Sequence, residues 1–452
     1  MKTIIEPGRE IPVLAEADVL VVGSGPGGLS AAIAAARTGA DVLLVEEYGC
    51  FGGNLTQVGV QTIGWYDIGA CIDSEGICRE LEARAKQYGA AYERPNARRL
   101  SINGEAFKYA ADRIVIEEGI RPLLHCKTVA AVMEGNTIGG IVTESKSGRQ
   151  AVLAKRVIDA TGDADVAVAA GAETHKTPVD EMLGVTVVFS CSGVNKEKFL
   201  AYVNERKPRF GDWGKNWSIR TDGKEDDLFC PYLEEEFNRA QEKGIIPKGI
   251  QSIGGTFGHL TEHGEATYLN MLYMMKYDAT SVEELTRAEM DGRQLAMWAI
   301  AALKSEVPGF ENATLRDFGM KLGVRDTRKI VSRGNLTGDD VFGQARFADT
   351  IGIFPEFIDG YEVLFLPTTG RYFQIPYGIL LPKSVENLLV AGRCVGGDKM
   401  SHAATRNMMC CAVTGQAAGT AAALSLRENV TPGALNVALL QKELVAQGAR
   451  IN

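Results

Sequence analysis

Short apolar runs separated by glycine-rich turns dominate the first part of the chain. Residues 17–22 (ADVLVV) are apolar almost throughout, as expected of a strand buried on both faces of a parallel sheet. A glycine-rich turn and an alanine-rich stretch that ends at Gly39 follow, and residues 40–47 (ADVLLVEE) form a second apolar run. This order predicts a β–turn–α–β unit within about 30 residues.

The next apolar patterns predict further strands and helices. Helical periodicity marks residues 74–90, 110–121 and 281–305, and Ser281 with Glu284 forms a capping-box sequence at the start of the third stretch. Two runs inside residues 175–383, at 182–190 and 266–274, alternate like sheet strands. Three runs at residues 127–133, 137–144 and 151–160 are separated by turn-like EGN and KSGR, which predicts an antiparallel meander. Residues 386–426 repeat the order of strand, glycine-rich turn and helix that is predicted for the first part of the chain.

Composition and charge narrow the class of protein. The 452 residues include 51 glycines, which indicates many tight turns or close backbone approaches, and the net charge is -9 with no basic stripe, which argues against a nucleic-acid partner. No apolar run reaches the ~18 residues of a membrane span. Nine cysteines without a C-x-x-C pair argue against zinc ribbons and iron–sulfur loops and favour a reduced, cytoplasmic protein.

The first glycine-rich turn has the spacing of a dinucleotide-binding loop. Gly23, Gly25 and Gly28 form G-x-G-x-x-G, with Pro26 and Gly27 between the last two. The first glycine permits a tight turn, the second lets the backbone approach a pyrophosphate, and the third lets the helix pack on the strand. Glu46 follows at a spacing that suits ribose hydroxyls and disfavours a 2′-phosphate.

Other segments resemble one family, the FAD-dependent oxidoreductases built like glutathione reductase and fumarate reductase. The resemblance is carried by Phe51–Thr56 (a GG-x-x-T loop), Val157–Asp163, Gly323–Arg328 (G-V-R-x-T-R) and Asn387–Arg393, together with Arg406 and Gly415–Gly419. It implies an α/β fold with a Rossmann-like FAD-binding domain, made of a parallel sheet plus a three-stranded antiparallel meander. That domain would span residues 1–173 and 384–452, and residues 174–383 would be an inserted α+β substrate domain.

The resemblance also implies which residues hold FAD, without a covalent bond. Thr128 and Val129 would present backbone to the adenine, Asp398 would meet ribityl hydroxyls, and Arg406 with the helix at 408–424 would face the flavin; ordinary sheet or turn roles remain the alternative for Thr128, Val129 and Asp398. The expected cofactor-binding set is Gly23, Gly25, Pro26, Gly27, Gly28, Glu46, Glu47, Gly52, Gly53, Asn54, Thr56, Thr128, Val129, Ala160, Thr161, Gly162, Asp163, Gly392, Arg393, Asp398 and Arg406.

Candidates for substrate chemistry lie near these segments. His402 can act as a base while a hydride leaves for the flavin, or can be a histidine bonded to backbone near the cofactor. Arg325 and Arg328 can clamp a carboxylate or form an interdomain ion pair, and Asn270 can line the pocket. His259 and His263 are four residues apart, but flanking glycines and the lack of a third ligand argue against a metal site.

The sequence therefore predicts an FAD-dependent dehydrogenase or oxidase acting on a small organic molecule, with His402, Arg325 and Arg406 as catalytic candidates. Two alternatives stay open: reduction of an activated double bond with Arg325 or another acid as proton donor, and a flavin-binding electron-transfer subunit without its own substrate. The electron acceptor is not indicated, and the alanine-rich C-terminal region is compatible with a homo-oligomer.

Overall fold

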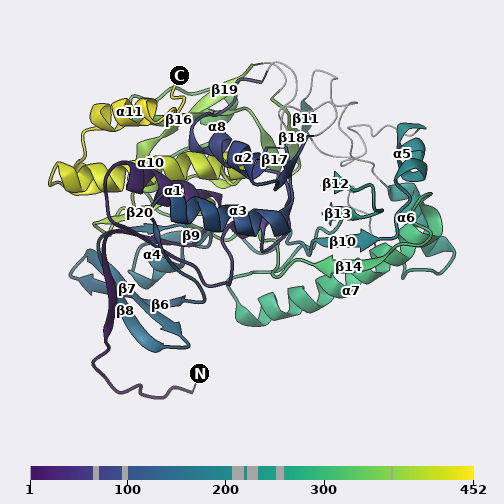
Figure 1. The fold of residues 1–452 in the computed structure, drawn as a ribbon, viewed down its shortest axis with the longest axis horizontal. Helices are drawn as coiled ribbons and strands as arrows, with labels where there is room; N and C mark the ends of the chain where they lie inside the picture. The colour runs from purple at the N-terminus through teal and green to yellow at the C-terminus, as the bar shows by residue number, and fades with distance from the viewer. Residues whose placement is uncertain are drawn as a thin grey trace.

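The computed structural model of the chain describes residues 2–64, 71–93, 100–205, 218–220, 233–250, 259–367 and 370–452. Its central sheet has the strand order β5-β2-β1-β8-β7-β6, and β20 also pairs with β8 (Figure 1). Strands β5, β2, β1, β8 and β20 run parallel, whereas β6, β7 and β8 form the antiparallel meander. The fold is therefore the α/β class that the sequence predicted.

The central body is built by two distant parts of the chain. Its elements are β1 (Val13–Val22), α1 (Pro26–Arg37), β2 (Val42–Val45), α2 (Ile77–Gln87), β3 (Ala91–Tyr92), β4 (Ser101–Ile102), α3 (Gly104–Glu117), β5 (Arg121–Leu123), β6 (Lys127–Glu134), β7 (Thr137–Ser145), β8 (Gly148–Asp159), α4 (Asp165–Ala169), β20 (Leu388–Val390), α9 (Lys399–Thr405), α10 (Met408–Arg427) and α11 (Val437–Ala446). The apolar runs at β1 and β2 are buried along most of their length, as the sequence pattern indicated.

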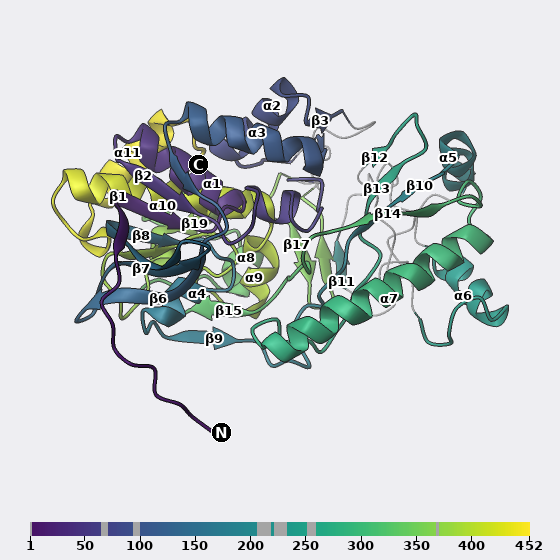
Figure 2. The same ribbon diagram turned by 60° about the horizontal axis from the view of Figure 1, so that its bottom comes forward.

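Helices α1 and α10 lie side by side across the central sheet (Figures 1 and 2). Their backbones touch because glycine stands at the contact: a Cβ on Gly415 would collide with the Gly27 carbonyl, and one on Gly419 would collide with the Ala31 carbonyl. Among the described helices, α10 is the one long and apolar enough to cross a membrane, but it is buried inside this body. Its apolar character is thus used for packing against α1.

A second body carries the long helix α7 (Val282–Glu306) along the sheet β12-β13-β10-β14 (Figure 2). Its elements are β10 (Phe189–Ser192), α5 (Lys196–Glu205), α6 (Glu234–Glu242), β12 (His259–Leu260), β13 (Ala266–Leu269), α7 and β14 (Thr314–Phe318). A separate hydrophobic cluster, drawn from residues 185–322, fills this body.

Residues 328–381 connect the two bodies and pack with the first. They contain β15 (Arg328–Ile330), which pairs with β9 (Thr174–Lys176), and also α8 (Gly338–Phe342), β16 (Thr350–Pro355), β17 (Ile358–Gly360), β18 (Val363–Phe365) and β19 (Tyr372–Pro376). Strand β11 (Ser218–Arg220) reaches back to pair with β18. Buried apolar side chains between Ile330 and Leu381 belong to the same hydrophobic cluster as the central sheet, and the domain boundary at residue 383 stays a prediction.

The local expectations hold in part. Helix α7 begins where Ser281 predicts, and the Ser281 side chain accepts the Glu284 N–H; the Glu284 carboxylate, however, accepts the Asp278 N–H instead of closing a capping box. Helix α3 starts at Gly104, before the expected residue 110, because Asn103 caps it by accepting the N–H groups of the next turn. The alternating runs at 182–190 and 266–274 form shorter strands, β10 and β13.

We predict that Gly415→Ala destabilises the protein by about 1–3 kcal/mol, the usual cost of forcing extra atoms into a packed interior. The added methyl group would collide with the Gly27 carbonyl. Thermal melting of the FAD-loaded protein measures the effect, with Gly139→Ala as the control because its nearest neighbour would lie 3.9 Å away. Equal melting temperatures for both variants would contradict the role of this contact.

Candidate functional site

The glycine loop between β1 and α1 is held open by residues that allow no side chain. Gly23 has a φ of +93°, and a Cβ there would come 2.5 Å from the Ala160 carbonyl oxygen at the end of β8. A Cβ on Gly28 would collide with the carbonyl of Gly23. Pro26 occupies the first turn of α1, where its missing N–H costs nothing. The loop therefore has the shape that its glycine spacing predicted.

Three glycine-bearing stretches, far apart in the sequence, meet at this loop. A Cβ on Gly53 would lie 2.6 Å from the Cα of Gly25, and one on Gly27 would lie 3.2 Å from the backbone nitrogen of Gly392. The Gly52 N–H also donates to the Ser24 carbonyl at 3.0 Å. By contrast, a Cβ on Gly392, whose φ is +86°, would meet no atom within 4 Å. The three stretches thus meet through their backbones, and Gly392 faces open space.

Two long helices direct their N-termini to this region without side-chain caps. The N-cap of α1 is Gly25, which has no side chain to cap it, and the side chain of Asn407, the N-cap of α10, accepts no hydrogen bond from that helix. Neither helix has an acidic residue in its first turn. Uncapped N–H groups and a positive dipole end attract phosphate or other negative charge. The glycine loop, the meeting point of the three glycine-bearing stretches and these two helix ends fit a bound FAD, with its pyrophosphate and its flavin.

The acidic residues after β2 differ in their surroundings. Glu46 is buried, its Oε2 accepts the Ser24 N–H at 3.0 Å, and its Oε1 accepts the Tyr48 N–H at 3.0 Å. Glu47 is half-exposed and forms an ion pair with Lys127 at 3.2 Å. Glu46 therefore holds the glycine loop in shape, and contact of either acid with a ribose stays a prediction.

The other residues expected near the cofactor's two ends are placed as follows. Thr128 has a buried hydroxyl with no hydrogen-bond partner, and Val129 beside it is 37% exposed. Thr56 donates its hydroxyl to the Phe51 carbonyl at 2.6 Å, which fixes the double-glycine loop. Asp398 caps α9 and accepts the N–H groups of Ser401 and Gly338 at 2.7 and 2.9 Å. Both Asp398 oxygens are thus bonded to the chain itself, which favours its cap role over a direct contact with ribityl hydroxyls.

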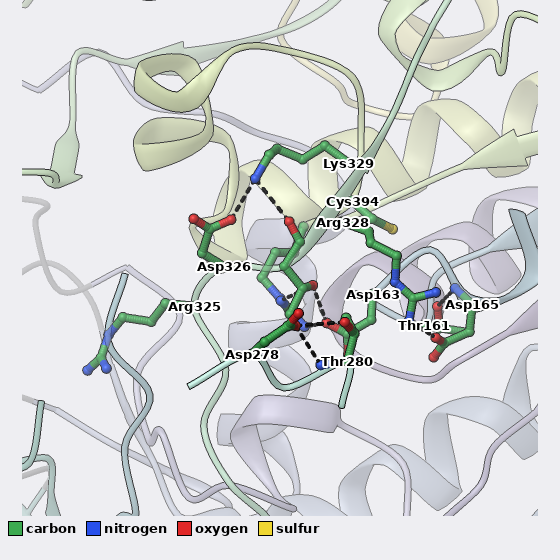
Figure 3. A network of polar contacts seen from close by, with 12 residues as sticks. Thr161, Asp163, Asp165, Asp278, Thr280, Arg325, Asp326, Arg328, Lys329 and Cys394 are labelled. Carbon is green, nitrogen blue, oxygen red and sulfur yellow. Dashed lines mark hydrogen bonds and ion pairs between the residues drawn. The ribbon is translucent and has the colours of Figure 1, made fainter. Parts of the chain in front are cut away.

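A network of charged and polar side chains joins the turn after β8 to the start of β15 and the residues just before it (Figure 3). Thr161 donates to the buried Asp159 at 2.7 Å, and this bond shapes the turn that contains Ala160 and Gly162. Arg393 donates to Asp163 at 2.7 Å and to the Thr327 hydroxyl at 3.1 Å.

Two further contacts complete this network. The Thr327 hydroxyl donates to Asp163, and Arg328 pairs with Asp165 at 2.9 Å. Burial opposes the charge on Asp163, but Arg393 and Thr327 outweigh it and keep the pKa of Asp163 below its ordinary value. Burial, followed by the charges of Asp163 and Asp159, raises the pKa of Asp165 to about 6. Arg328 therefore acts as an ion-pair partner and not as a carboxylate clamp.

A cavity of 120 Å³ lies where the flavin segments meet the second body. Its wall combines residues from both sides. The first body supplies Asn54, Val60, Thr62, Ile63, Asp359, Arg393, Arg406, Asn407 and Met408, and the other side supplies Thr186, Tyr268, Asn270, Gly323, Val324 and Arg325. Tyr268 adopts a φ of 56°, a conformation that bulky residues rarely take and that clusters at functional sites. Met408 is the first residue of α10, so the uncapped end of this helix reaches the cavity.

The two arginines of this cavity have different partners. Arg406 donates to the Asp359 carboxylate at 3.1 Å and to the Asp359 carbonyl. Arg325 donates to the Gly184 carbonyl at 2.7 Å and to Asn270 Oδ1 at 3.2 Å, both neutral acceptors. The expectation that Asn270 lines a pocket is consistent with this geometry. Among the described residues, Arg328 forms an ion pair with Asp165, whereas Arg325 forms none.

His402 lies behind the cavity wall and not on it. Its side chain is 2% exposed, and Nε2 donates to the Arg325 carbonyl at 3.0 Å. Burial, followed by the Lys329 ammonium, holds the pKa of His402 well below its ordinary value, so the ring is neutral. The structure therefore shows His402 as a backbone-bonded histidine near the site, the second of the two expectations, and a contact of its ring with substrate stays a prediction.

A second cavity of 430 Å³ lies beside the first, between α3 and the sheet of the second body. Thr56, Val58 and Gly59 line it, and His259 at its wall stacks on Tyr92 with ring centroids 4.3 Å apart. Within the described ranges no cluster of three or more His, Cys, Asp or Glu side chains is placed to bind a metal. His259 therefore packs against an aromatic ring.

Residues 18–444 match the family described as FAD dependent oxidoreductase. The chain belongs to this family. Sequence relatives include the sarcosine oxidase subunit alpha of Corynebacterium sp. (strain P-1), 38% identical over 98 residues, which are 22% of this chain and 9% of that protein. Another is digeranylgeranylglycerophospholipid reductase 2 of Methanopyrus kandleri, 30% identical over 190 residues, which are 38% of this chain and 46% of that protein. The chain thus spans less than half the length of both relatives.

Solved structures with a similar fold include flavoproteins. A triple mutant of the flavin-dependent brominase Bmp2 aligns with a TM-score of 0.49 at 12% identity, covering 95% of this chain and 84% of that chain. A geranylgeranyl bacteriochlorophyll reductase-like protein from Thermoplasma acidophilum gives a TM-score of 0.46 at 12% identity, covering 96% and 87%.

The sequence analysis missed several residues of the site. Asp359 and Tyr268 line the cavity, and Asp326 forms a buried ion pair with Lys329 at 2.5 Å behind it. Asp326 and Lys329 belong to the charged stretch 325–329, whose composition is that of an exposed turn. Asp359 is the middle residue of the three-residue strand β17, which is too short for a sequence pattern to mark.

We predict that Asp163→Asn lowers stability at neutral pH by about 1–3 kcal/mol, because Arg393 then loses its charged partner inside the protein. The folded-state pKa of Asp163 is depressed, so its stabilising effect is present above the unfolded value of about 3.9 and disappears as the pH falls through the folded value. The difference in melting temperature between the two proteins should therefore shrink below about pH 4.

The control for this prediction is Asp41→Asn, which breaks an exposed pair with Arg121 and should change stability little. Melting curves of wild type and both variants across acid and neutral pH measure the effect. The prediction is contradicted if the difference in melting temperature between wild type and Asp163→Asn is as large below about pH 4 as at neutral pH, because the ionised Asp163 carboxylate would then not be its cause.

Proposed function

We propose that the protein oxidises a small organic molecule in the 120 Å³ cavity. The observation that carries this proposal is the composition of the cavity wall, which joins flavin-binding segments to the second body. FAD, when bound, supplies the acceptor for a hydride that leaves a substrate C–H bond, while the proton of the adjacent O–H or N–H group passes to water. A wall shared between two bodies is the usual setting of a flavoenzyme substrate site.

The chain's own residues give this cavity a positive and partly apolar interior. Val60, Ile63 and Met408 exclude water, and the uncapped N-terminus of α10 favours negative charge that develops near it. Arg325, which donates only to neutral acceptors among the described residues, adds a second positive group. These features support a role in which the protein stabilises negative charge that develops on the reduced flavin next to the substrate.

The reverse reaction, reduction of an activated double bond, is the second candidate. One sequence relative is named a reductase, and Arg325 offers a donor inside the cavity. A third view, a flavin-binding subunit that transfers electrons without a substrate, is disfavoured by the presence of a cavity at the junction.

Anaerobic mixing of the FAD-loaded protein with hydroxy acids, sugars and amines tests the proposal. We expect at least one compound to bleach the flavin absorbance at a rate that saturates with concentration. Reoxidation of the dithionite-reduced protein by enoates, with no bleaching by any donor, would instead support the reductase. No response in either direction would support the electron-transfer subunit and contradict the proposal.

We predict that His402→Gln keeps the bleaching rate within about threefold, because the Gln amide can still donate to the Arg325 carbonyl. His402→Leu should slow the reaction, since it leaves this carbonyl without a donor. The pH profile of the bleaching rate should keep its shape in both variants. If the pH profile of the His402→Gln variant loses one limb that the wild-type profile has, His402 acts as the base and this prediction is wrong.

A further inference from the structure

Arg325 is a partly buried cation without a carboxylate partner. Its guanidinium donates to the carbonyl of Gly184 and to Asn270 Oδ1, and it lies 5.1 Å from the centre of the Tyr273 ring. No Asp or Glu in the described residues lies within ion-pair distance of it. Figure 3 shows its side chain extending away from the neighbouring Asp326–Lys329 pair. Burial and the nearby Arg406 lower the pKa of Arg325, and the more distant Asp359 opposes this effect only in part.

The other charges of the cavity wall cancel. Arg393 is paired with Asp163 at 2.7 Å, and Arg406 with Asp359 at 3.1 Å. Arg325 is therefore the residual charge of the wall, and α10 adds its positive end at Met408. Buried charges in proteins are normally paired, because an unpaired one is costly to remove from water. The missing partner here is an anion.

The backbone on either side of Arg325 is tightly held. His402 donates to the Arg325 carbonyl, and the next residue, Asp326, accepts from Lys329 and from the Tyr361 hydroxyl, each at 2.5 Å. Asp326 and Lys329 are each 1% exposed. This support lies outside the cavity and fixes the position from which the Arg325 side chain enters it. A fixed guanidinium suits planar, two-point recognition of a carboxylate.

Asn270 adds a neutral donor beside the guanidinium. Its Oδ1 accepts from Arg325 and from the Thr186 hydroxyl at 3.0 Å, which orients the amide. Its Nδ2 has no acceptor among the described residues. The Arg325 guanidinium and the Asn270 amide thus offer one charged and one neutral donor at the same wall. This pair suits the two oxygens of a carboxylate that has a polar group beside it.

We propose that the substrate carries a carboxylate, which binds to the Arg325 guanidinium in this cavity. This inference rests on the proposed function for the meaning of "substrate", but the binding itself can be measured without turnover. The competing role for Arg325 is to stabilise negative charge on the reduced flavin. That role predicts a change in flavin midpoint potential and no change in anion affinity.

The test is titration of the oxidised, FAD-loaded protein with acetate, glycolate and succinate, and with acetamide, glycolamide and succinamide as uncharged counterparts. Perturbation of the flavin absorbance spectrum and calorimetry report the affinity. The variants are Arg325→Met and Asn270→Asp, the second of which places a carboxylate beside Arg325 without changing the side-chain volume. Arg328→Met is the matched control, because Arg328 pairs with Asp165 outside the cavity.

We expect at least one carboxylate to bind at least about tenfold more tightly than its amide, and Arg325→Met to remove that preference. Asn270→Asp should also remove it while the melting temperature stays close to wild type, which keeps the test valid if Arg325→Met fails to fold. Arg328→Met should bind as wild type does.

Three outcomes would overturn the proposal: equal affinity for carboxylates and amides, a carboxylate preference that survives in Asn270→Asp, or a shifted flavin potential in Arg325→Met with unchanged anion affinity. Carboxylate binding without flavin bleaching would uphold the anion site while the proposed oxidation fails, so the two claims are separable.

Discussion

Backbone contact between glycines holds the site together. Gly27 in α1 touches Gly415 in α10 and lies beside Gly392, while Gly25 meets Gly53. Each of these contacts needs the absence of a Cβ on at least one side, and together they bring the ends of four segments within reach of one bound nucleotide. The uncapped starts of α1 and α10 then give that region its positive potential.

Charge pairing sets the second level of organisation. Asp163 with Arg393 and Asp165 with Arg328 join the turn after β8 to the strand that leads out of the second body. The buried Asp326–Lys329 pair lies immediately beside them in the sequence and further stiffens this strand. Because every neighbouring cation in this group has an acidic partner, the neutral surroundings of Arg325 stand out as a feature of the cavity.

The sequence predicted the parts of the site that depend on local geometry. The spacing of Gly23, Gly25 and Gly28 predicts a turn that only glycine permits, and the meander at β6–β8 follows from alternation and turn residues. The setting of His402 could not be predicted, because its burial and its bond to the Arg325 carbonyl arise from packing between α9 and a distant strand. Likewise, the packing of residues 330–381 against the central core depends on tertiary contacts, which the pattern of apolar residues in the sequence does not predict.

The position of α10 has a consequence for how the protein is made. This helix covers α1 and supplies one of the two helix ends at the cofactor region, yet it is encoded after residue 407. During synthesis, the first β–α–β unit leaves the ribosome long before its neighbour exists, with the apolar face of α1 uncovered. The region around the glycine loop is therefore complete only once α10 has been made and has packed, and until then α1 exposes apolar surface of the kind that favours aggregation.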